Sequence, residues 1–179
     1  MPISQIVTNS IANDAVVTVD IANGAVTSAK MASGAARANF GAGAVLQVVQ
    51  GTTGTQVESS YSSATSLGLS LSITPTSATS RILVIVTPAG CGSRATNTQW
   101  AITLRRNTTN LINFATYIGL NQGNGAETYP SCSYIDSPNT TSSISYNLIG
   151  TRTSGSDNCY FNHSDGSAVS TMVAMEIAA

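Results

Sequence analysis

Five acidic side chains in the second half of the sequence are of the type that could hydrolyse a glycosidic bond. This chemistry requires two carboxylates about 5–10 Å apart, one of which acts as the acid. Asp157 and Asp165 flank a predicted hairpin and could approach each other there. Both also stand in turn-forming sequence, where aspartate is common, and a turn role is the competing interpretation. The full set of candidates is Glu127, Asp136, Asp157, Asp165 and Glu176.

Other catalytic or metal-binding chemistry has less support. The sequence has one histidine, His163, which excludes a metal motif built on two histidines. Cys159 lies four residues earlier, about 13 Å away along a strand, so only a loop could bring the two together. The many serines are not accompanied by a Gly-x-Ser-x-Gly motif. No catalytic residue, metal or cofactor is therefore predicted.

The cysteines do not form a recognisable framework. They are odd in number and irregularly spaced, unlike the cysteines of a disulfide-rich domain or a zinc site. We expect them to be small buried side chains. They are Cys91, Cys132 and Cys159.

The composition favours a β-rich protein with a hydroxyl-rich surface. The chain has 179 residues, 42% of them hydrophobic and only 8% charged. It contains 25 serines and 23 threonines, and threonine suits a pleated strand. The net charge is −1, and Arg105-Arg106 is the only adjacent basic pair, so no basic face for nucleic acid is expected.

Membrane insertion and conventional export are not predicted either. No stretch approaches the roughly 20 apolar residues that span a bilayer. The first ten residues, MPISQIVTNS, lack a basic segment followed by an apolar run, so a classical signal peptide is not expected. Another route out of the cell, such as lysis inside an assembled particle, is expected.

Near the N-terminus, almost the same ten residues occur three times. The units begin IANDAV at residue 11, IANGAV at residue 21 and MASGAA at residue 31. Each combines a turn signal with a short segment rich in small and β-branched residues, and has too few large side chains to form a core alone. Repeat units are usually stabilised by stacking on neighbours. Other copies of the chain would supply them here.

The repeats therefore predict a self-associating stalk over residues 1–42. Small alanines allow close backbone approach, and larger aliphatic residues fill the axis. The competing interpretation is an arm that becomes ordered only on a partner. A helix is disfavoured, because each glycine would cost it about 1 kcal/mol. The candidate oligomer or attachment residues are Ile11, Ala15, Ile21, Ala25, Met31 and Ala35.

From residue 45 onward the sequence indicates short strands. Apolar residues alternate with small or polar ones at 67–73, 100–104, 112–118 and 144–148. Residues 82–86 (ILVIV) are apolar on both faces and predict a central strand covered on both sides. Residues 159–162 and 170–177 predict a final hairpin that turns at Ser164-Asp165-Gly166.

About eight such strands without a helical pattern predict an all-β fold. We expect an antiparallel β-sandwich of jelly-roll type over residues 43–179, the knob, preceded by the short extended stalk or arm. An immunoglobulin-like strand order is the alternative. Glycines around residues 41–43 indicate a hinge between the two parts.

These stretches resemble a known family. The IANGAVTSAKMASGA units resemble repeats of phage tail fibres and other virion fibres. The segments SLGLSLSITPTSATSRILVIV, YIDSPNTTSSISYNLIG and STMVAMEIA resemble a β-sandwich knob of phage fibre and structural proteins. The resemblance covers most of the chain and brings no catalytic residues.

The resemblance implies a non-enzymatic bacteriophage virion protein. In this reading a homotrimeric fibre or spike is attached to tail or capsid proteins through its N-terminal segment, and the knob contacts a host glycan or protein. A polar loop is the candidate contact, and an ordinary solvated loop is the competing interpretation; Tyr134 and Asp136 are assigned to a nearby turn. The alternatives are a capsid decoration protein or head fibre and, third, a polysaccharide-cleaving spike. The candidate receptor-contact residues are Asn121, Gln122, Asn124, Glu127 and Tyr129.

Overall fold

The computed structural model describes residues 41–94, 97–118, 128–163 and 168–179. The chain divides into two units, Met1–Phe40 and Gly41–Ala179, and the described residues all belong to the second. The decapeptide repeats and all six candidate attachment residues therefore lie outside the described residues. The stalk remains a prediction.

The described part is all-β and contains eight long or medium strands and three short ones. The long set is β1 (Val45–Thr53), β3 (Thr65–Ile73), β4 (Arg81–Thr87), β6 (Gln99–Arg106), β7 (Thr109–Ile118), β8 (Cys132–Asp136), β9 (Ile144–Ser154) and β11 (Ser170–Ile177). The short strands are β2 (Val57–Ser59), β5 (Gly92–Ser93) and β10 (Cys159–Phe161).

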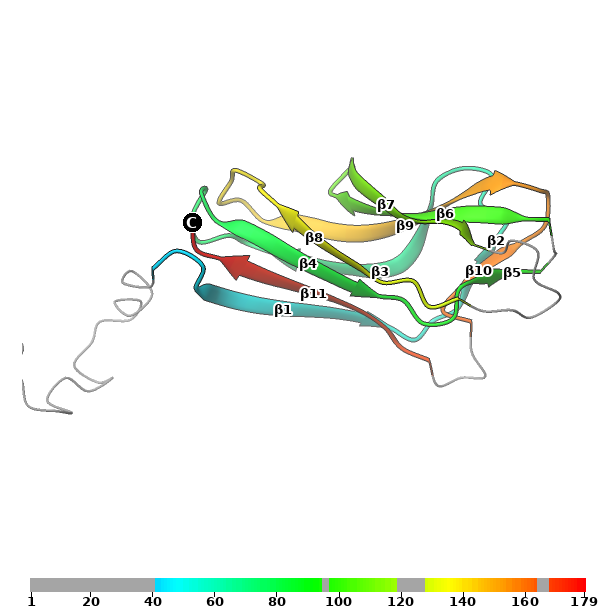
Figure 1. The fold of residues 1–179 in the computed structure, drawn as a ribbon, viewed down its shortest axis with the longest axis horizontal. Helices are drawn as coiled ribbons and strands as arrows, with labels where there is room; N and C mark the ends of the chain where they lie inside the picture. Colours follow the sequence, from blue (N-terminus) through cyan, green and yellow to red (C-terminus); the bar gives the residue numbers. More distant parts are fainter. Residues whose placement is uncertain (1–40, 95–96, 119–127, 164–167) are drawn as a thin grey trace, which may run out of the picture. The chain divides into compact units, whose positions relative to one another are not determined.

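The long strands form two antiparallel four-stranded sheets that face each other (Figure 1). The first sheet has the order β1-β11-β4-β8, and the second has the order β3-β9-β6-β7. Consecutive long strands thus mostly alternate between the sheets, which is the jelly-roll arrangement of two Greek keys. The three short strands form a separate small sheet, β2-β10-β5. The predicted jelly-roll-like sandwich is confirmed.

The core lies between the two four-stranded sheets and follows the strand periodicity. On β3, Leu67, Leu69, Leu71 and Ile73 are buried, while the serines between them are exposed. On β9, the side chains of Ile144, Tyr146 and Leu148 are buried in the same way. Side chains at every second position of a strand point to one face of the sheet. The residues of β3 and β9 that face the core are therefore the ones predicted from the sequence.

The prediction that both faces of β4 are covered is correct for one face only. Ile82, Val84 and Val86 are fully buried in the core, but Leu83 and Ile85 are only half-buried. β4 is an interior strand of its sheet, as expected. Nothing in the described part of the chain covers the outer face of that sheet, so the second apolar face of β4 lies at the surface.

The prediction that Ile112, Phe114, Thr116 and Ile118 share one face of β7 is wrong for Phe114 and Thr116. The residues opposite Leu104, Ile102 and Trp100 on β6 are Ile112, Ala115 and Ile118. Register shifts between these pairs place every third residue of β7 on the inner face. Phe114 is therefore half-buried and Thr116 exposed, whereas Ala115 is buried.

The predicted final hairpin is also wrong. β10 pairs with β2 and β5, whereas β11 pairs with β1 and β4. Asn162 follows β10 in a left-handed conformation (φ 58°), and its side-chain oxygen accepts hydrogen bonds from the Ser170 amide and hydroxyl. This linkage fixes the passage from the small sheet to the large one. The predicted turn at 164–166 lies outside the described residues.

A further correction concerns Tyr134 and Asp136, which were assigned to a turn. Both lie on β8, an edge strand that pairs with β4. The Asp136 side chain points inward and is buried. Its carboxylate accepts hydrogen bonds from Arg106 Nη1 at 2.8 and 2.9 Å and from the Tyr146 hydroxyl at 2.6 Å. It joins three strands of the sandwich instead of capping a turn.

Candidate interaction surfaces

The predicted receptor-contact loop is only partly described. Asn121, Gln122, Asn124 and Glu127 lie outside the described residues, so their role remains a prediction. Tyr129 is described, and 67% of its surface is exposed. The backbone just before it is anchored, because Thr128 and Cys91 exchange two backbone hydrogen bonds of 2.8 and 2.9 Å. Tyr129 is thus an exposed aromatic ring on a fixed segment.

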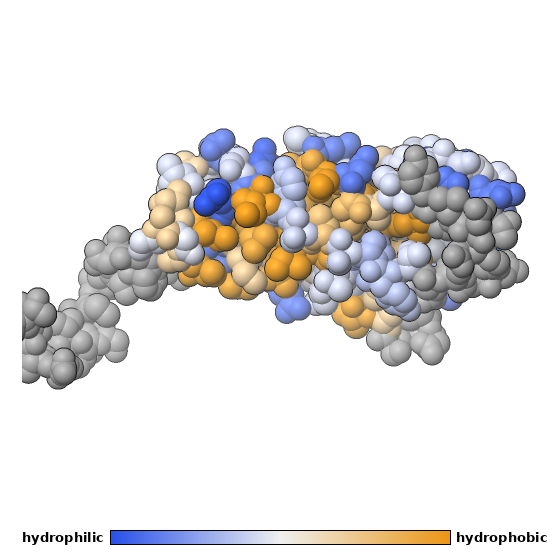
Figure 2. Space-filling model, in the orientation of Figure 1, coloured by the Kyte–Doolittle hydropathy of each residue, from blue (hydrophilic) through white to orange (hydrophobic). Residues whose placement is uncertain are grey.

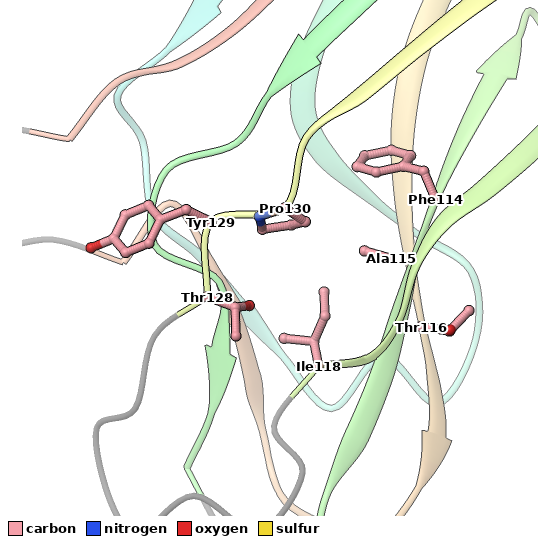
Figure 3. A pocket seen from close by; sticks show the side chains of 7 residues that line it. All are labelled: Phe114, Ala115, Thr116, Ile118, Thr128, Tyr129 and Pro130. Atoms are coloured by element: carbon pink, nitrogen blue, oxygen red, sulfur yellow. The ribbon is translucent and has the colours of Figure 1, made fainter.

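A groove of about 410 Å³ lies between this segment and β7 (Figure 3). Figure 3 shows Ile118 and Pro130 on opposite sides of it, Phe114 at the far wall, and the Tyr129 ring directed away from the interior. No charged side chain is among its seven lining residues, Phe114, Ala115, Thr116, Ile118, Thr128, Tyr129 and Pro130. Such a lining suits apolar contact and stacking, as in sugar or peptide recognition.

Two of the five candidate acids are structural. Asp136 is held by Arg106 and Tyr146, as described above. Glu176 is completely buried on β11 and accepts hydrogen bonds from Gln47 Nε2 at 2.6 Å and from the Thr76 amide and hydroxyl at 2.7 Å each. Neither carboxylate can reach a bound polysaccharide. Asp157 is exposed, but Asp165 and Glu127 lie outside the described residues.

Glu176 should make the stability of the sandwich depend on pH. Burial by itself would raise its pKa, but the hydrogen bonds from Gln47 and Thr76 outweigh burial and lower it. A lowered pKa means that the unfolded chain takes up the proton first as the pH falls. The stabilising contribution is therefore complete above the ordinary carboxyl pKa and is lost as the pH falls through the folded-state pKa.

We expect Glu176→Gln to reduce the acid-induced loss of stability between about pH 7 and about pH 3. Urea unfolding at a series of pH values, with the native chain measured in parallel, checks this. An unchanged slope of unfolding free energy against pH would contradict the assignment.

Cys159 and His163 have different surroundings in the structure. Cys159 is fully buried, and burial raises the pKa of its thiol to about 12. The His163 ring instead contacts Tyr160, with ring centroids 4.4 Å apart. Among the described residues, no three His, Cys, Asp or Glu side chains are grouped to hold a metal. None of the three cysteines forms a disulfide; Cys91 and Cys159 are buried, as predicted, and Cys132 is half-buried.

The two large sheets differ in their outer faces. The outer face of the sheet β3-β9-β6-β7 is mainly polar, and Ala101 and Ile149 are its apolar members on β6 and β9. Ser70, Asn147 and Arg105 follow one another across three of its strands, and Thr103 donates a hydrogen bond to Asn113 next to them. This is the ordinary outer face of a sandwich in water.

The outer face of β1-β11-β4-β8 instead carries eight apolar side chains, next to the polar row Thr52-Thr171-Thr87 and the outward-facing Gln50, Ser133 and Arg81. Three of its large apolar side chains are at least half exposed: Val45 (50%), Val48 (57%) and Ile135 (53%). Figure 2 shows apolar residues gathered over this part of the surface. We call this surface the apolar face; its members are Val45, Val48, Leu83, Ile85, Ile135, Val173, Met175 and Ile177.

Within the described residues, no helix has the length and apolar character needed to cross a membrane.

Comparison with known proteins shows no relative by sequence. No protein-family model matches the chain, and no curated protein matches it.

Two structures of infectious bursal disease virus, one of the Gt strain and one of the T13 viral particle, superpose with TM-scores of 0.45 and 0.44 at 17% identity. A Gx-strain structure has a TM-score of 0.40 at 12% identity. Each alignment covers 74% of this chain but only 38%, 36% and 34% of the viral chain. The chain thus spans little more than a third of the viral chains it matches, and scores at this level give no basis for transferring a function.

Proposed function

We propose that this chain is a non-enzymatic structural protein of a bacteriophage particle. In this proposal it is a trimeric fibre or spike whose N-terminal segment attaches to tail or capsid proteins and whose knob contacts the host surface. The single observation that carries the proposal is the contrast between the two outer faces of the sandwich. A sheet face with several exposed aliphatic side chains beside one another is characteristic of a protein that works in an assembly.

Host contact is assigned to the end of the sandwich that carries Tyr129 and its groove. The chain enters the sandwich at the opposite end (Figure 1), where Gly43 donates a hydrogen bond to the carbonyl of Ala178. An exposed aromatic ring beside an uncharged groove fits a glycan or peptide. Copies held together would multiply a weak contact through avidity.

The main alternative is a capsid decoration protein, which would also account for the aliphatic outer face. In that case the apolar face lies on the capsid shell, and the N-terminal segment drapes over neighbouring subunits. Electron microscopy of particles labelled with antibodies against the chain separates the two functions. Label at the tail or at projecting fibres supports the fibre, label spread over the head supports decoration, and unlabelled particles contradict both.

Host attachment predicts a specific effect of Tyr129. The purified full chain should compete with the phage for host cells, and Tyr129→Ala should weaken this competition about fivefold, the loss of one aromatic contact. Thr141→Ala, at an exposed position in the loop between β8 and β9, is the matched control and should compete like the native chain. If Tyr129→Ala and Thr141→Ala compete equally well, Tyr129 is not part of the host contact.

A further inference from the structure

We infer that the apolar face is the surface through which the knobs of neighbouring copies of this chain associate. The inference rests on the proposed fibre and names the knob–knob contact within it. Three sheets facing a common axis would bring the edge strand β1 of one copy next to the edge strand β8 of the next. The fibre proposal itself does not require this, because its stalk could hold three separate knobs.

The register of the four strands shows that the apolar face is continuous. Val48 lies opposite Met175, Met175 opposite Leu83, and Leu83 opposite Ile135, so one complete row across the sheet is aliphatic. In the next row, Val173 and Ile85 are flanked by Gln50 and Ser133. Val45 and Ile177 form the adjoining row, which ends in Arg81.

Aliphatic side chains are not present on the outer face of every long strand of this sandwich. The outward positions of β3, a strand of the same length as β1, are Ser66, Gly68, Ser70 and Ser72. Outward serine or threonine is therefore compatible with this architecture. Exposed aliphatic rows also favour aggregation unless a partner covers them. The aliphatic residues of this face therefore indicate that another surface covers it.

The low charge of the apolar face favours a second copy of this chain as the partner that covers it. Arg81 is the one charged residue on this face of the described strands, and it lies at the end of a row. A face almost without charge does not repel its own copy, and it lacks the lysines and arginines that nucleic acid or an anionic lipid surface would require. Identical aliphatic faces are complementary in chemistry to one another.

The size of the face explains why the contact would depend on the stalk. With strands about 4.8 Å apart and about 6.7 Å between successive outward rows, the face measures about 20 by 20 Å, or about 400 Å². A stable standard interface buries about 800 Å² per partner. The face alone therefore supports only weak association. Copies already joined by their N-terminal segments have a high effective concentration, at which such a contact forms.

Cysteine labelling and cross-linking of the full chain test this assignment. Val48→Cys/Ile135→Cys places thiols at two exposed positions on opposite edges of the face, and Ser70→Cys/Ser72→Cys is the matched variant on the polar face. The native chain reports the background from its own three cysteines. Each protein is treated with a monofunctional maleimide, to measure accessibility, and with a short bis-maleimide, to detect linked chains.

We expect the introduced thiols of the apolar face to react at least tenfold more slowly than those of the polar face. With bis-maleimide left long enough for these slower thiols to react to completion, we expect linked chains only in Val48→Cys/Ile135→Cys. Equal reaction rates would overturn the inference, because the face would be uncovered. Slow reaction without linked chains would also overturn it, because something other than a second copy would cover the face.

Light scattering on the same samples separates this inference from the proposed function. A trimer with freely reactive thiols at 48 and 135 refutes the knob–knob contact and leaves the fibre intact. A monomer with freely reactive thiols refutes both the contact and the trimeric fibre. Far-ultraviolet circular dichroism must show that each variant is folded; if Val48→Cys/Ile135→Cys is not, Ile135→Cys alone is compared with Ser72→Cys.

Discussion

Trp100→Ala is expected to lower the free energy of unfolding by about 3–5 kcal/mol, the usual cost of removing a large buried aromatic side chain. Trp100 is fully buried, and its indole ring stacks on Tyr61 with centroids 5.0 Å apart and planes 9° from parallel. Its Nε1–H donates a 3.0 Å hydrogen bond to the Gly92 carbonyl. The substitution would remove packing from the inner face and leave that carbonyl without its donor.

The neighbourhood of Trp100 leaves little room for relaxation. A Cβ added at Gly150 would lie 3.0–3.1 Å from atoms of Leu67, Trp100 and Tyr61. Tyr61 itself adopts a left-handed backbone (φ 45°), which a large side chain rarely does unless its contacts stabilise it. The stack on Trp100 and the hydrogen bond from the Tyr61 hydroxyl to the Val57 carbonyl supply such contacts.

Urea unfolding followed by far-ultraviolet circular dichroism measures the effect without relying on tryptophan fluorescence. Trp100→Phe is the control, because it keeps an aromatic ring and removes the N–H donor. Its loss should be nearer the 1–3 kcal/mol of an unpaired buried polar group. A loss below about 1 kcal/mol for Trp100→Ala would contradict the central role of the stack.

Asp136→Ala is the second substitution expected to have a large effect. Only 6% of the Asp136 side chain is exposed, and its carboxylate holds both Arg106 and the Tyr146 hydroxyl. Burial first, and then the neighbouring Asp136 carboxylate, raise the pKa of Tyr146, so this hydroxyl stays protonated and donates. Removing the carboxylate would leave a guanidinium and a hydroxyl without an acceptor.

The expected loss is about 3 kcal/mol, the lower end of the range for breaking a buried ion pair. The lower end applies because 25% of the Arg106 side chain reaches solvent. Glu58→Gln is the control. It weakens the exposed Arg94–Glu58 pair, whose side chains are 51% and 29% exposed, and should cost less than about 1 kcal/mol.

A double-mutant cycle between Asp136→Ala and Tyr146→Phe isolates the contribution of the hydroxyl. Unfolding free energies of the native chain, the two single variants and the double variant are required. Similar small losses for Asp136→Ala and Glu58→Gln would show that the buried cluster is not a stability determinant.

Strand alternation predicted the fold where each strand keeps a period of two. This is the case for β3 and β9, whose inner residues were identified from sequence. It fails on β7, where register shifts bring Ala115 inward in place of Phe114 and Thr116. A bulge adds a residue without any marker in a single sequence, so periodicity could not have located it. The false hairpin has a different cause, since sequence proximity suggested a pairing that the two strands make with other partners.

The candidate surfaces were predictable to different degrees. Glu176 shares the parity of the buried Met172 and Ala174 on β11, and this position could have identified it as an inward structural acid. The double-sided apolar pattern of residues 82–86 predicts a strand covered on both sides, and it does not say which of the two apolar faces lies at the surface. Which surface lies outside depends on the order of the strands in the sheets. Only the structure supplies that order.

The hydrogen bonds between Gly43, Ala44 and Ala178 have a mechanical consequence. The polypeptide enters the sandwich at Gly41 and runs directly into β1, whose partners on β11 extend from Ser170 to Ile177. If the distal end of the sandwich adheres and the particle pulls on the N-terminal segment, tension acts along the axis of β1. The whole β1–β11 ladder then bears the force in shear, and its hydrogen bonds share the load instead of opening one after another.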